Sequence, residues 1–429
     1  MQQPLEQQHD RVRESEQDRV QVLLIRLTMI LLRGSAEGVF IIQQLVQLVA
    51  QAYQTHVNMQ FLPDSVILQV QTPQTTTTHL LTARPDVIRL DLLSQLRELV
   101  VEIMGGNVSV EQANARLNVL ENAAPLYTPL LKALGIVLFA VGFGTSVQLT
   151  WQEMLLSLFL GCIIGPLVVF SQRRSRMMLA LPCLAAFVDA ICVLLIYRLG
   201  ILRGGPIQLM IPVLFYFIPG DYLSVALAEL AWGYISAGSI RLIYSTFLLL
   251  TLLVGVYLGV IITHTPTSAL FDANVGPDFG WEFTALGWFV FALGLVLIFS
   301  IRWRDFGWVV LFIYLAYFTQ LIATLAFGEL GGVFLGGTVI AFLGSLLARN
   351  PTHPPLLVLI LGAFFVLTVG SLGLRGLTTW IGGNVLQGFH DVFSMLSLGL
   401  ALALGLLIGH LIALLVPAKK GSFPGEMKA

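Results

Sequence analysis

Asp189 is the residue whose type and position most clearly indicate chemistry, because it is an acid near the middle of the apolar run 178–197. An isolated carboxylate inside hydrocarbon costs several kcal/mol unless it is protonated or paired. Asp189 could therefore hold a cationic group of a substrate, or carry a proton as the coupling step of transport. The structural alternative is a helix-pairing contact with Arg198 or Arg241.

Asp221 and Glu229 follow a point where an apolar segment is interrupted. Pro219-Gly220-Asp221 closes the segment 206–219, and proline removes a backbone donor and clashes with the preceding turn, so we expect the helix to open here. The amides and carbonyls that an opened helix frees can hold ligand charges within a membrane. Asp221 and Glu229 are eight residues apart, on roughly the same helical face, so both could look into one cavity. A solvated cytoplasmic face is the equally compatible alternative.

A second interruption, at 369–373, occupies the corresponding place later in the chain. A zwitterionic substrate needs an acid for its ammonium group, and amides or hydroxyls for its carboxylate. A dicarboxylate would instead need cations, for which Arg198, Arg241 and Arg375 are available. The candidate substrate-binding residues are Asp189, Pro219, Gly220, Asp221, Ser224, Glu229, Gly370, Ser371 and Arg375.

The remaining polar and sulfur-containing residues have simpler interpretations. His410, within the last apolar run, is interpreted as a core histidine with a satisfied hydrogen bond. Three acids stand at the ends of apolar runs, where reaching out to water is the default: Glu153, Glu329 and Asp391. Three cysteines lack the spacing of a metal or redox site and are interpreted as small buried hydrophobes: Cys162, Cys183 and Cys192. Neither a metal nor a cofactor is predicted.

The elements that must position these residues are mostly apolar helices. Of 429 residues, 56% are hydrophobic and 11% are charged, and the mean hydropathy is +0.85. A soluble domain has roughly a quarter of its residues charged, so a water-soluble enzyme made of the whole chain is excluded. Residues 1–129 hold nine of the 23 Lys/Arg and 13 of the 24 Asp/Glu, which indicates a soluble module before a membrane module. The net charge of −1 offers no basic stripe, and nucleic acid is not expected as a partner.

Ten apolar runs approach the roughly 20 residues that a membrane span requires. They are 130–149, 153–170, 178–197, 206–219, 240–263, 283–301, 306–327, 330–347, 355–370 and 391–416. Lys and Arg gather in alternate connections, at 173–176, 302–304, 349 and 419–420. The positive-inside rule then places both termini in the cytoplasm, with Arg203 and Arg375 as exceptions.

The runs repeat with a nearly constant offset. Starts at 130 and 283, at 178 and 330, and at 240 and 391 differ by 153, 152 and 151 residues. Because each half has five spans, the second half must be inverted, and inverted repeats are typical of secondary transporters. We predict an α-helical multi-pass membrane protein of about ten transmembrane helices in two inverted five-helix halves. Its expected parts are a cytosolic domain (1–128), a first half (129–263), an extracytoplasmic loop (264–282), a second half (283–416) and a cytoplasmic tail (417–429).

Residues 1–128 predict a small α+β domain. Apolar residues recur at helical spacing over 21–53, with a break near Gly34. Thr- and Val-rich runs at 57–61, 65–70 and 76–82 predict an antiparallel sheet, and helices are expected at 91–104 and 109–123. Ser109, with Gln112 three residues on, matches a capping box. Lacking a nucleotide loop, metal spacing or nucleophile motif, the domain is expected to be a scaffold or regulator rather than an enzyme.

Six stretches are similar to a known membrane family: 31–37, 91–100, 108–117, 139–146, 217–221 (which contains Pro219-Gly220) and 355–376. On these stretches the chain resembles the threonine/serine exporter family over nearly its whole length. The resemblance implies five plus five spans behind a cytosolic domain, with halves that are separate chains in some relatives fused here. Phe40-Ile41-Ile42 replaces the family's Arg-Val-Glu, and 368–371 lacks the second Pro-Gly proline. Because two-chain relatives are associated with dicarboxylate export, the substrate stays open between amino acids and organic acids.

The resemblance names threonine or serine as the substrate, while the residues themselves indicate transport. We expect a proton-coupled antiporter, not an enzyme, in the plasma (inner) membrane, with a small-molecule substrate, protons and lipid as partners and with homo-oligomers left open. A small-dicarboxylate exporter is the alternative within that class. A membrane sensor or structural protein and an intramembrane aspartyl protease using Asp189 and Asp221 are alternatives of other classes, although the Gly-x-Gly-Asp pattern of such a protease is absent.

Overall fold

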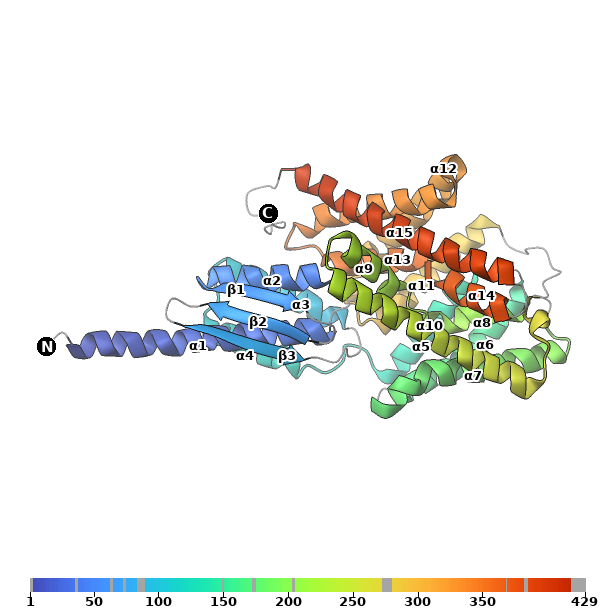
Figure 1. The fold of residues 1–429 in the computed structure, drawn as a ribbon, viewed down its shortest axis with the longest axis horizontal. Coiled ribbons are helices and arrows are strands. Elements are labelled where there is room, and N and C mark those ends of the chain that lie inside the picture. Colours follow the sequence, from blue (N-terminus) through green and yellow to red (C-terminus); the bar gives the residue numbers. More distant parts are fainter. Residues whose placement is uncertain are drawn as a thin grey trace.

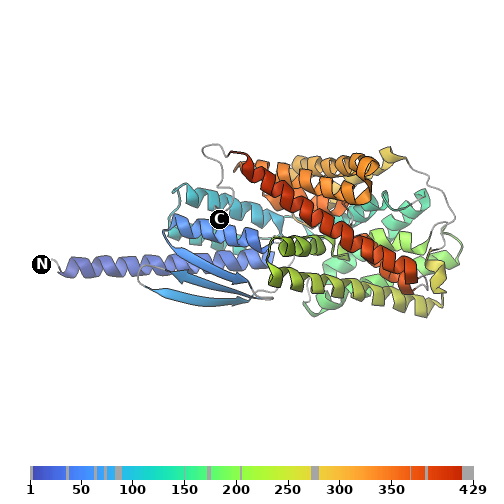
Figure 2. The ribbon, with the colours of Figure 1, turned by 45° about the horizontal axis from the view of Figure 1, so that its top comes forward.

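The chain forms an N-terminal domain and a larger helical module that lie end to end (Figure 1). The computed structural model describes residues 3–34, 38–61, 65–71, 75–82, 89–148, 150–171, 175–202, 205–271, 280–367, 369–381 and 385–417. Figure 2 shows the same division after rotation, with the N-terminal helix extending away from the bundle.

The N-terminal domain is a three-stranded sheet packed on helices. Its elements are α1 (Gln3–Gly34), α2 (Val39–Ala52), β1 (His56–Phe61), β2 (Ser65–Gln71), β3 (Thr76–Thr82), α3 (Leu90–Met104) and α4 (Val110–Glu121). The strands are antiparallel in the order β1-β2-β3. Every second residue of β2 is buried, namely Val66, Leu68 and Val70, as the two-residue period of a strand with one covered face requires.

The predictions for this domain are largely confirmed. The sheet is present, and the break near Gly34 separates α1 from α2. The capping box forms at α4: Ser109 Oγ accepts the Gln112 amide at 3.3 Å, and Gln112 Oε1 accepts the Ser109 amide at 3.1 Å. The first helix begins at Gln3 and is longer than predicted. The prediction began at residue 21 because the Gln- and charge-rich turns before it lack apolar periodicity.

The helical module contains all remaining elements. These are α5 (Pro129–Gly144), α6 (Trp151–Ser171), α7 (Ser175–Arg198), α8 (Pro206–Leu214), η1 (Phe215–Phe217), α9 (Gly220–Ala231), α10 (Ile235–Thr263), η2 (Thr267–Phe271), α11 (Trp281–Ile298), η3 (Trp303–Asp305), α12 (Phe306–Ala348), α13 (Leu356–Val366), α14 (Val369–Ile381) and α15 (Val385–Leu415). Within the described residues, six helices are long and apolar enough to cross a membrane, or up to seven if the bent pair α8–α9 is one span. The chain is therefore a multi-pass membrane protein.

The expected runs do not all become separate long helices. The runs 306–327 and 330–347 are joined in α12, where Gly328 interrupts the helical backbone with φ 72° and ψ −179°. An L-residue with a side chain rarely adopts this φ, so glycine is the residue that permits the sharp change of direction. α13 has only 11 residues and α5 has 16, both below the length of an untilted span.

Glycines bring α5 and α11 into close contact. A Cβ on Gly142 would lie 2.7 Å from the carbonyl oxygen of Gly287, and a Cβ on Gly294 would lie 2.7 Å from that of Gly135. Small residues of this kind let helix backbones approach in a membrane, where apolar burial provides little driving force between helices. The two helices therefore form a tight pair at the centre of the module.

α10 and α15 use glycines in the same way against their own neighbours. Gly255 and Gly259 of α10 pack on α7, where added Cβ atoms would meet the side chain of Ala186 at 2.7 Å and that of Ala190 at 2.6 Å. Gly405 and Gly409 of α15 pack on the backbone of α12 near residues 334–342.

Three interpretations of single residues are corrected. Cys162 is exposed on the outside of α6 rather than buried, and Cys183 and Cys192 are half-buried. Glu153 does not reach out to water: it is fully buried, and its Oε2 accepts the amide of Thr150 at 3.1 Å to cap α6. Asp391 is also buried, because it pairs with an arginine on the preceding helix.

Candidate functional site

Asp189 lies within α7 and is fully buried. Among the described residues, neither of its carboxylate oxygens has a hydrogen-bond partner. The arginines that could have paired with it contact other groups. Arg198 donates to the carbonyl oxygen of His264 at 3.0 Å, and Arg241 pairs with Glu229. A buried polar group without a partner calls for an explanation, and a proton or a bound ammonium group would supply one.

The first interruption is a sharp bend. The helical segments Pro206–Phe217 and Gly220–Ala231 meet at 62°, and Pro219 stands at the N-cap of α9. The Gly220 amide turns back to the carbonyl of Ile218 at 2.8 Å, and Asp221 lies in the first turn of α9, where the helix dipole favours an acid. Ser224 is buried, and its hydroxyl donates to the Gly220 carbonyl at 2.7 Å. The opening predicted at Pro219 is thus present.

Glu229 lies near the C-terminal end of α9, and its carboxylate already has hydrogen-bond partners. Its carboxylate accepts two hydrogen bonds from Arg241 of α10, each at 3.1 Å, and one from the amide of Val39 at 3.0 Å. Val39 begins α2 of the N-terminal domain, so this carboxylate links α9, α10 and the domain. The Arg241 guanidinium also lies over the ring of Tyr222, 5.8 Å from its centroid.

The second interruption separates α13, which ends at Val366, from α14, which begins at Val369. Gly370 and Ser371 fall in the first turn of α14 rather than between helices, and the side chain of Ser371 is outside the part of the chain that the structure describes. Arg375, further along α14, makes two hydrogen bonds of 3.0 Å to Asp391 of α15. Gln387 donates to the same carboxylate at 3.0 Å.

The structure brings the two interruptions together in the fold. α9 packs against α13, α14 and α15, and α14 packs against α8 and α10. The short helices that follow the two interruptions, α9 and α14, therefore pack on each other. The helix that carries Asp189, α7, packs on α8 and α10. His410 is buried on α15 beside Trp232, and its Nδ1 shares a 2.9 Å hydrogen bond with Ser345, in agreement with its interpretation as a core histidine.

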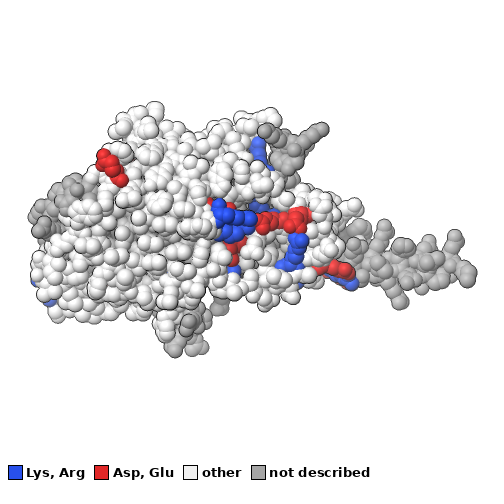
Figure 3. Space-filling view, turned by 180° about the vertical axis from the view of Figure 1, so that it is seen from behind, with Lys and Arg blue, Asp and Glu red and all other residues white. Residues whose placement is uncertain are grey.

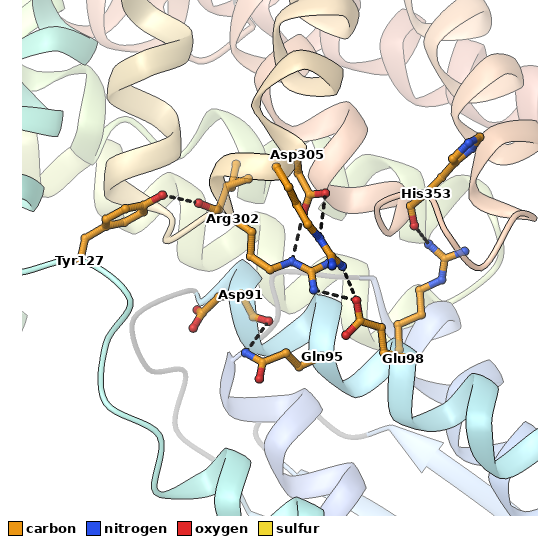
Figure 4. A network of polar contacts seen from close by, with 10 residues as sticks. Asp91, Gln95, Glu98, Tyr127, Arg302, Asp305 and His353 are labelled. Atoms are coloured by element: carbon orange, nitrogen blue, oxygen red, sulfur yellow. Dashed lines mark hydrogen bonds and ion pairs between the residues drawn. The ribbon is translucent and has the colours of Figure 1, made fainter. Parts of the chain in front are cut away.

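Sequence reasoning missed a polar junction between the N-terminal domain and the helical module. Figure 3 shows Lys, Arg, Asp and Glu gathered in a band at this junction, with only a few charged residues elsewhere on this face. In Figure 4, Glu98 of α3 points toward the connection that precedes α12. It pairs with Arg302 at 2.7 Å and with Arg304, while Tyr127 donates to the carbonyl of Ile301 at 2.8 Å.

Backbone groups complete this junction. The Leu90 amide donates to the carbonyl of Phe299 at 3.0 Å, and the Arg97 guanidinium donates to the carbonyls of Ala348 and His353. Burial acts to raise the pKa of Glu98, but hydrogen bonds and charges from Arg302 and Arg304 outweigh it, and the pKa is lowered. The only sequence signal was the positive charge of the 302–304 connection, which was assigned to membrane orientation alone.

An apolar pocket lies where α2 meets the helical module. Its walls include Phe40 of α2, Trp232, which follows α9, and Ile360 of α13. The ring centroids of Phe40 and Trp232 are 3.7 Å apart. The pocket belongs to the contact between the N-terminal domain and α9, rather than to the interruption at Pro219.

Comparison with known proteins gives one match. The family model described as "putative threonine/serine exporter" matches residues 22–263, which run from α1 to the end of α10. No curated protein and no solved structure matches the chain.

Proposed function

Since the chain belongs to the threonine/serine exporter family, we propose that it exports threonine, serine or a similar small amino acid in exchange for protons. It would act in the plasma (inner) membrane, with both termini and the N-terminal domain in the cytoplasm. The interruptions before α9 and α14 would bind the substrate, with amides near Gly220 and Ser371 facing its carboxylate.

The observation that carries this proposal is the contrast between Asp189 and the arginines. Asp189 is buried with no hydrogen-bond partner among the described residues, whereas Arg241 and Arg375 are each held by a buried carboxylate. A buried unpaired acid suits an ammonium group or a proton. A dicarboxylate would have to displace Glu229 or Asp391 to reach these arginines, so an amino acid is favoured over it.

The glycine contacts support two inverted halves. Gly135 and Gly142 of α5 are separated from Gly287 and Gly294 of α11 by 152 residues, and each glycine of one helix packs near the opposite member of the other pair. Gly255 and Gly259 of α10 stand 150 residues before Gly405 and Gly409 of α15. The glycines of α10 and α15 each hold that helix to the third predicted span of its own half, α7 for α10 and the second part of α12 for α15. Such a correspondence is expected of repeats that share one packing scheme.

The test is efflux from cells loaded with threonine-containing dipeptides, comparing wild type with Asp189→Asn. We expect efflux to fall to background in the variant, because the side chain keeps its size but can neither carry a proton nor neutralise an ammonium group. Glu153→Gln is the matched control, since Glu153 is another fully buried acid but caps α6. Unchanged efflux in Asp189→Asn would remove Asp189 from the mechanism, and absence of efflux from wild type would remove the amino-acid assignment.

The same preparations separate the alternatives. Reconstituted protein that moves labelled succinate but not threonine would favour the dicarboxylate exporter. Threonine binding by the full chain that survives Asp189→Asn and Asp221→Asn without any transport would favour a sensor. Cleavage of a membrane peptide that either variant abolishes would favour the aspartyl protease.

A further inference from the structure

Two ion pairs with buried carboxylates join the short helix after each interruption to the long helix that follows it. Glu229 of α9 pairs with Arg241 of α10, and Arg375 of α14 pairs with Asp391 of α15. Each pair is bidentate, with distances of 3.1 Å in the first and 3.0 Å in the second. The carboxylates are 0% and 3% exposed, so both charges have been withdrawn from water and depend on their partners.

The two pairs lie at opposite ends of the helical module. Glu229 accepts the amide of Val39, so its pair lies against the N-terminal domain. In Figure 1, α14 and the beginning of α15 lie at the end of the molecule farthest from that domain. The Arg375 side chain is 47% exposed there, whereas that of Arg241 is 20% exposed.

The pairs also occupy related positions with their charges reversed. Arg241 and Asp391 are 150 residues apart, as are the beginnings of α10 at 235 and of α15 at 385. In the first pair the acid is on the short helix, and in the second it is on the long one. The same bidentate contact thus occurs in two corresponding helix pairs, α9–α10 and α14–α15, one at each end of the helical module.

We propose that Glu229–Arg241 and Arg375–Asp391 are the two gates of an alternating-access cycle, an inference that rests on the proposed transport function. Breaking the first pair frees α9 from α10 and opens a path on the side of the N-terminal domain. Breaking the second frees α14 from α15 and opens the opposite side. Either opening exposes an unpaired charge, which has to be hydrated or met by the substrate, so the closed gate is favoured until one of these occurs.

Isosteric neutralisation tests the two gates separately. Glu229→Gln keeps an acceptor for the Val39 amide, and Asp391→Asn keeps one for Gln387, but each removes the ion pair. Cys192 is the reporter, three residues beyond Asp189 on α7 and half-buried. The background carries Cys162→Ala and Cys183→Ala, and a membrane-impermeant maleimide is applied to vesicles of each orientation.

Opposite outcomes are expected from the two variants. Glu229→Gln should raise the labelling of Cys192 about tenfold from the side of the N-terminal domain. Asp391→Asn should raise it about tenfold from the other side. A tenfold change corresponds to a shift of ~1.4 kcal/mol in the equilibrium between the closed and open states. The charge-reversed pair Arg375→Asp with Asp391→Arg should return labelling to the wild-type pattern. If a carboxylate variant does not fold, Arg241→Gln or Arg375→Gln removes the same ion pair and should give the same side-specific rise in labelling.

Three results would overturn the gates: increased labelling from the same side in both variants, unchanged labelling in both, or a reversed pair that does not restore the wild-type pattern. Labelling requires no knowledge of the substrate. If labelling shifts as expected but threonine is not exported, the gate proposal stands and the assignment of threonine as substrate is wrong. If threonine is exported but labelling is unchanged, the transport proposal stands and the gate proposal is wrong.

Discussion

Reversal of Glu98 should detach the N-terminal domain from the connection before α12. Glu98 contacts Arg302 and Arg304, whose side chains are 17% and 60% exposed, and is itself 43% exposed. Ion pairs this accessible contribute roughly 0.2–1 kcal/mol each, because water screens them. Glu98→Arg loses both attractions and adds repulsion of similar size, so we expect docking to weaken by ~2 kcal/mol.

Hydrogen exchange at Leu90 measures this change directly. Its amide donates across the junction to the carbonyl of Phe299, so its protection depends on docking. A loss of ~2 kcal/mol raises the population of the undocked state, and with it the exchange rate, about 30-fold. Glu102→Arg is the matched control, since Glu102 lies on the same helix but pairs with Arg116 inside the domain. The reversed pair Glu98→Arg with Arg302→Glu should recover much of the protection.

Acid should act on the same contact. The pKa of Glu98 is lower in the folded protein than its ordinary value of 4.5, so its contribution to docking is complete above that value. As the pH falls below 4.5 and through the lowered pKa, the contribution is lost. The protection factor of the Leu90 amide, taken relative to its intrinsic exchange rate at each pH, should therefore fall with acidification in wild type and not in Glu98→Gln. Equal exchange in Glu98→Arg and Glu102→Arg, or equal acid sensitivity with and without Glu98, would refute this reasoning.

Two further predictions concern packing and capping. Gly142→Ala places a Cβ 2.7 Å from the Gly287 carbonyl oxygen and 2.7 Å from the Phe291 Cα. Because these backbone atoms cannot move aside cheaply, we expect the free energy of unfolding to fall by about 1–3 kcal/mol. A lower unfolding temperature in detergent would show this loss. Gly307→Ala, which meets nothing within 4 Å, should show no such loss, and equal effects of the two would contradict the close packing of α5 and α11. Ser109→Ala should destabilise α4 by about 1 kcal/mol and Ser109→Gly by only a few tenths, measured by exchange of its first amides; identical effects would argue against the capping box.

The sequence was most informative where local chemistry decides the structure. The Thr- and Val-rich runs that predict the antiparallel sheet, the Ser109 capping box and the chain-breaking Pro219 each depend on neighbours within a few residues. All three predictions are confirmed. The second interruption lacks a proline, and the sequence predicted it at 369–373 from its glycines. The helix α13 in fact ends at Val366, three to four residues earlier. Where no proline or other helix-breaking residue is present, an apolar sequence does not by itself define where a helix ends.

Partners of the buried charges could not be predicted, because they depend on how helices turn back on each other. Glu229 meets Arg241 because Gly233, with φ 86°, reverses the chain between α9 and α10 and sets which face of α10 is presented. Its third contact, Val39, is 190 residues away in sequence. Asp189 shows the converse: sequence located it and offered Arg198 and Arg241 as partners, and only the fold shows both arginines occupied elsewhere.

The N-terminal domain contacts the helical module through both α2 and α3, and this has a mechanical consequence. α2 contacts α9 through Val39 and Glu229, while α3 contacts the connection between α11 and α12 through Glu98 and Leu90. Within the domain α1 packs on α2, α3 and α4, and α3 packs on α2 and α4, so we expect these helices to move together. A displacement of α9 relative to the α11–α12 connection must therefore break one of these contacts or carry the domain with it. If export requires such a displacement, the Glu229 contact and the Glu98 contact compete, and weakening the Glu98 contact should ease the opening of α9 without any change at Glu229.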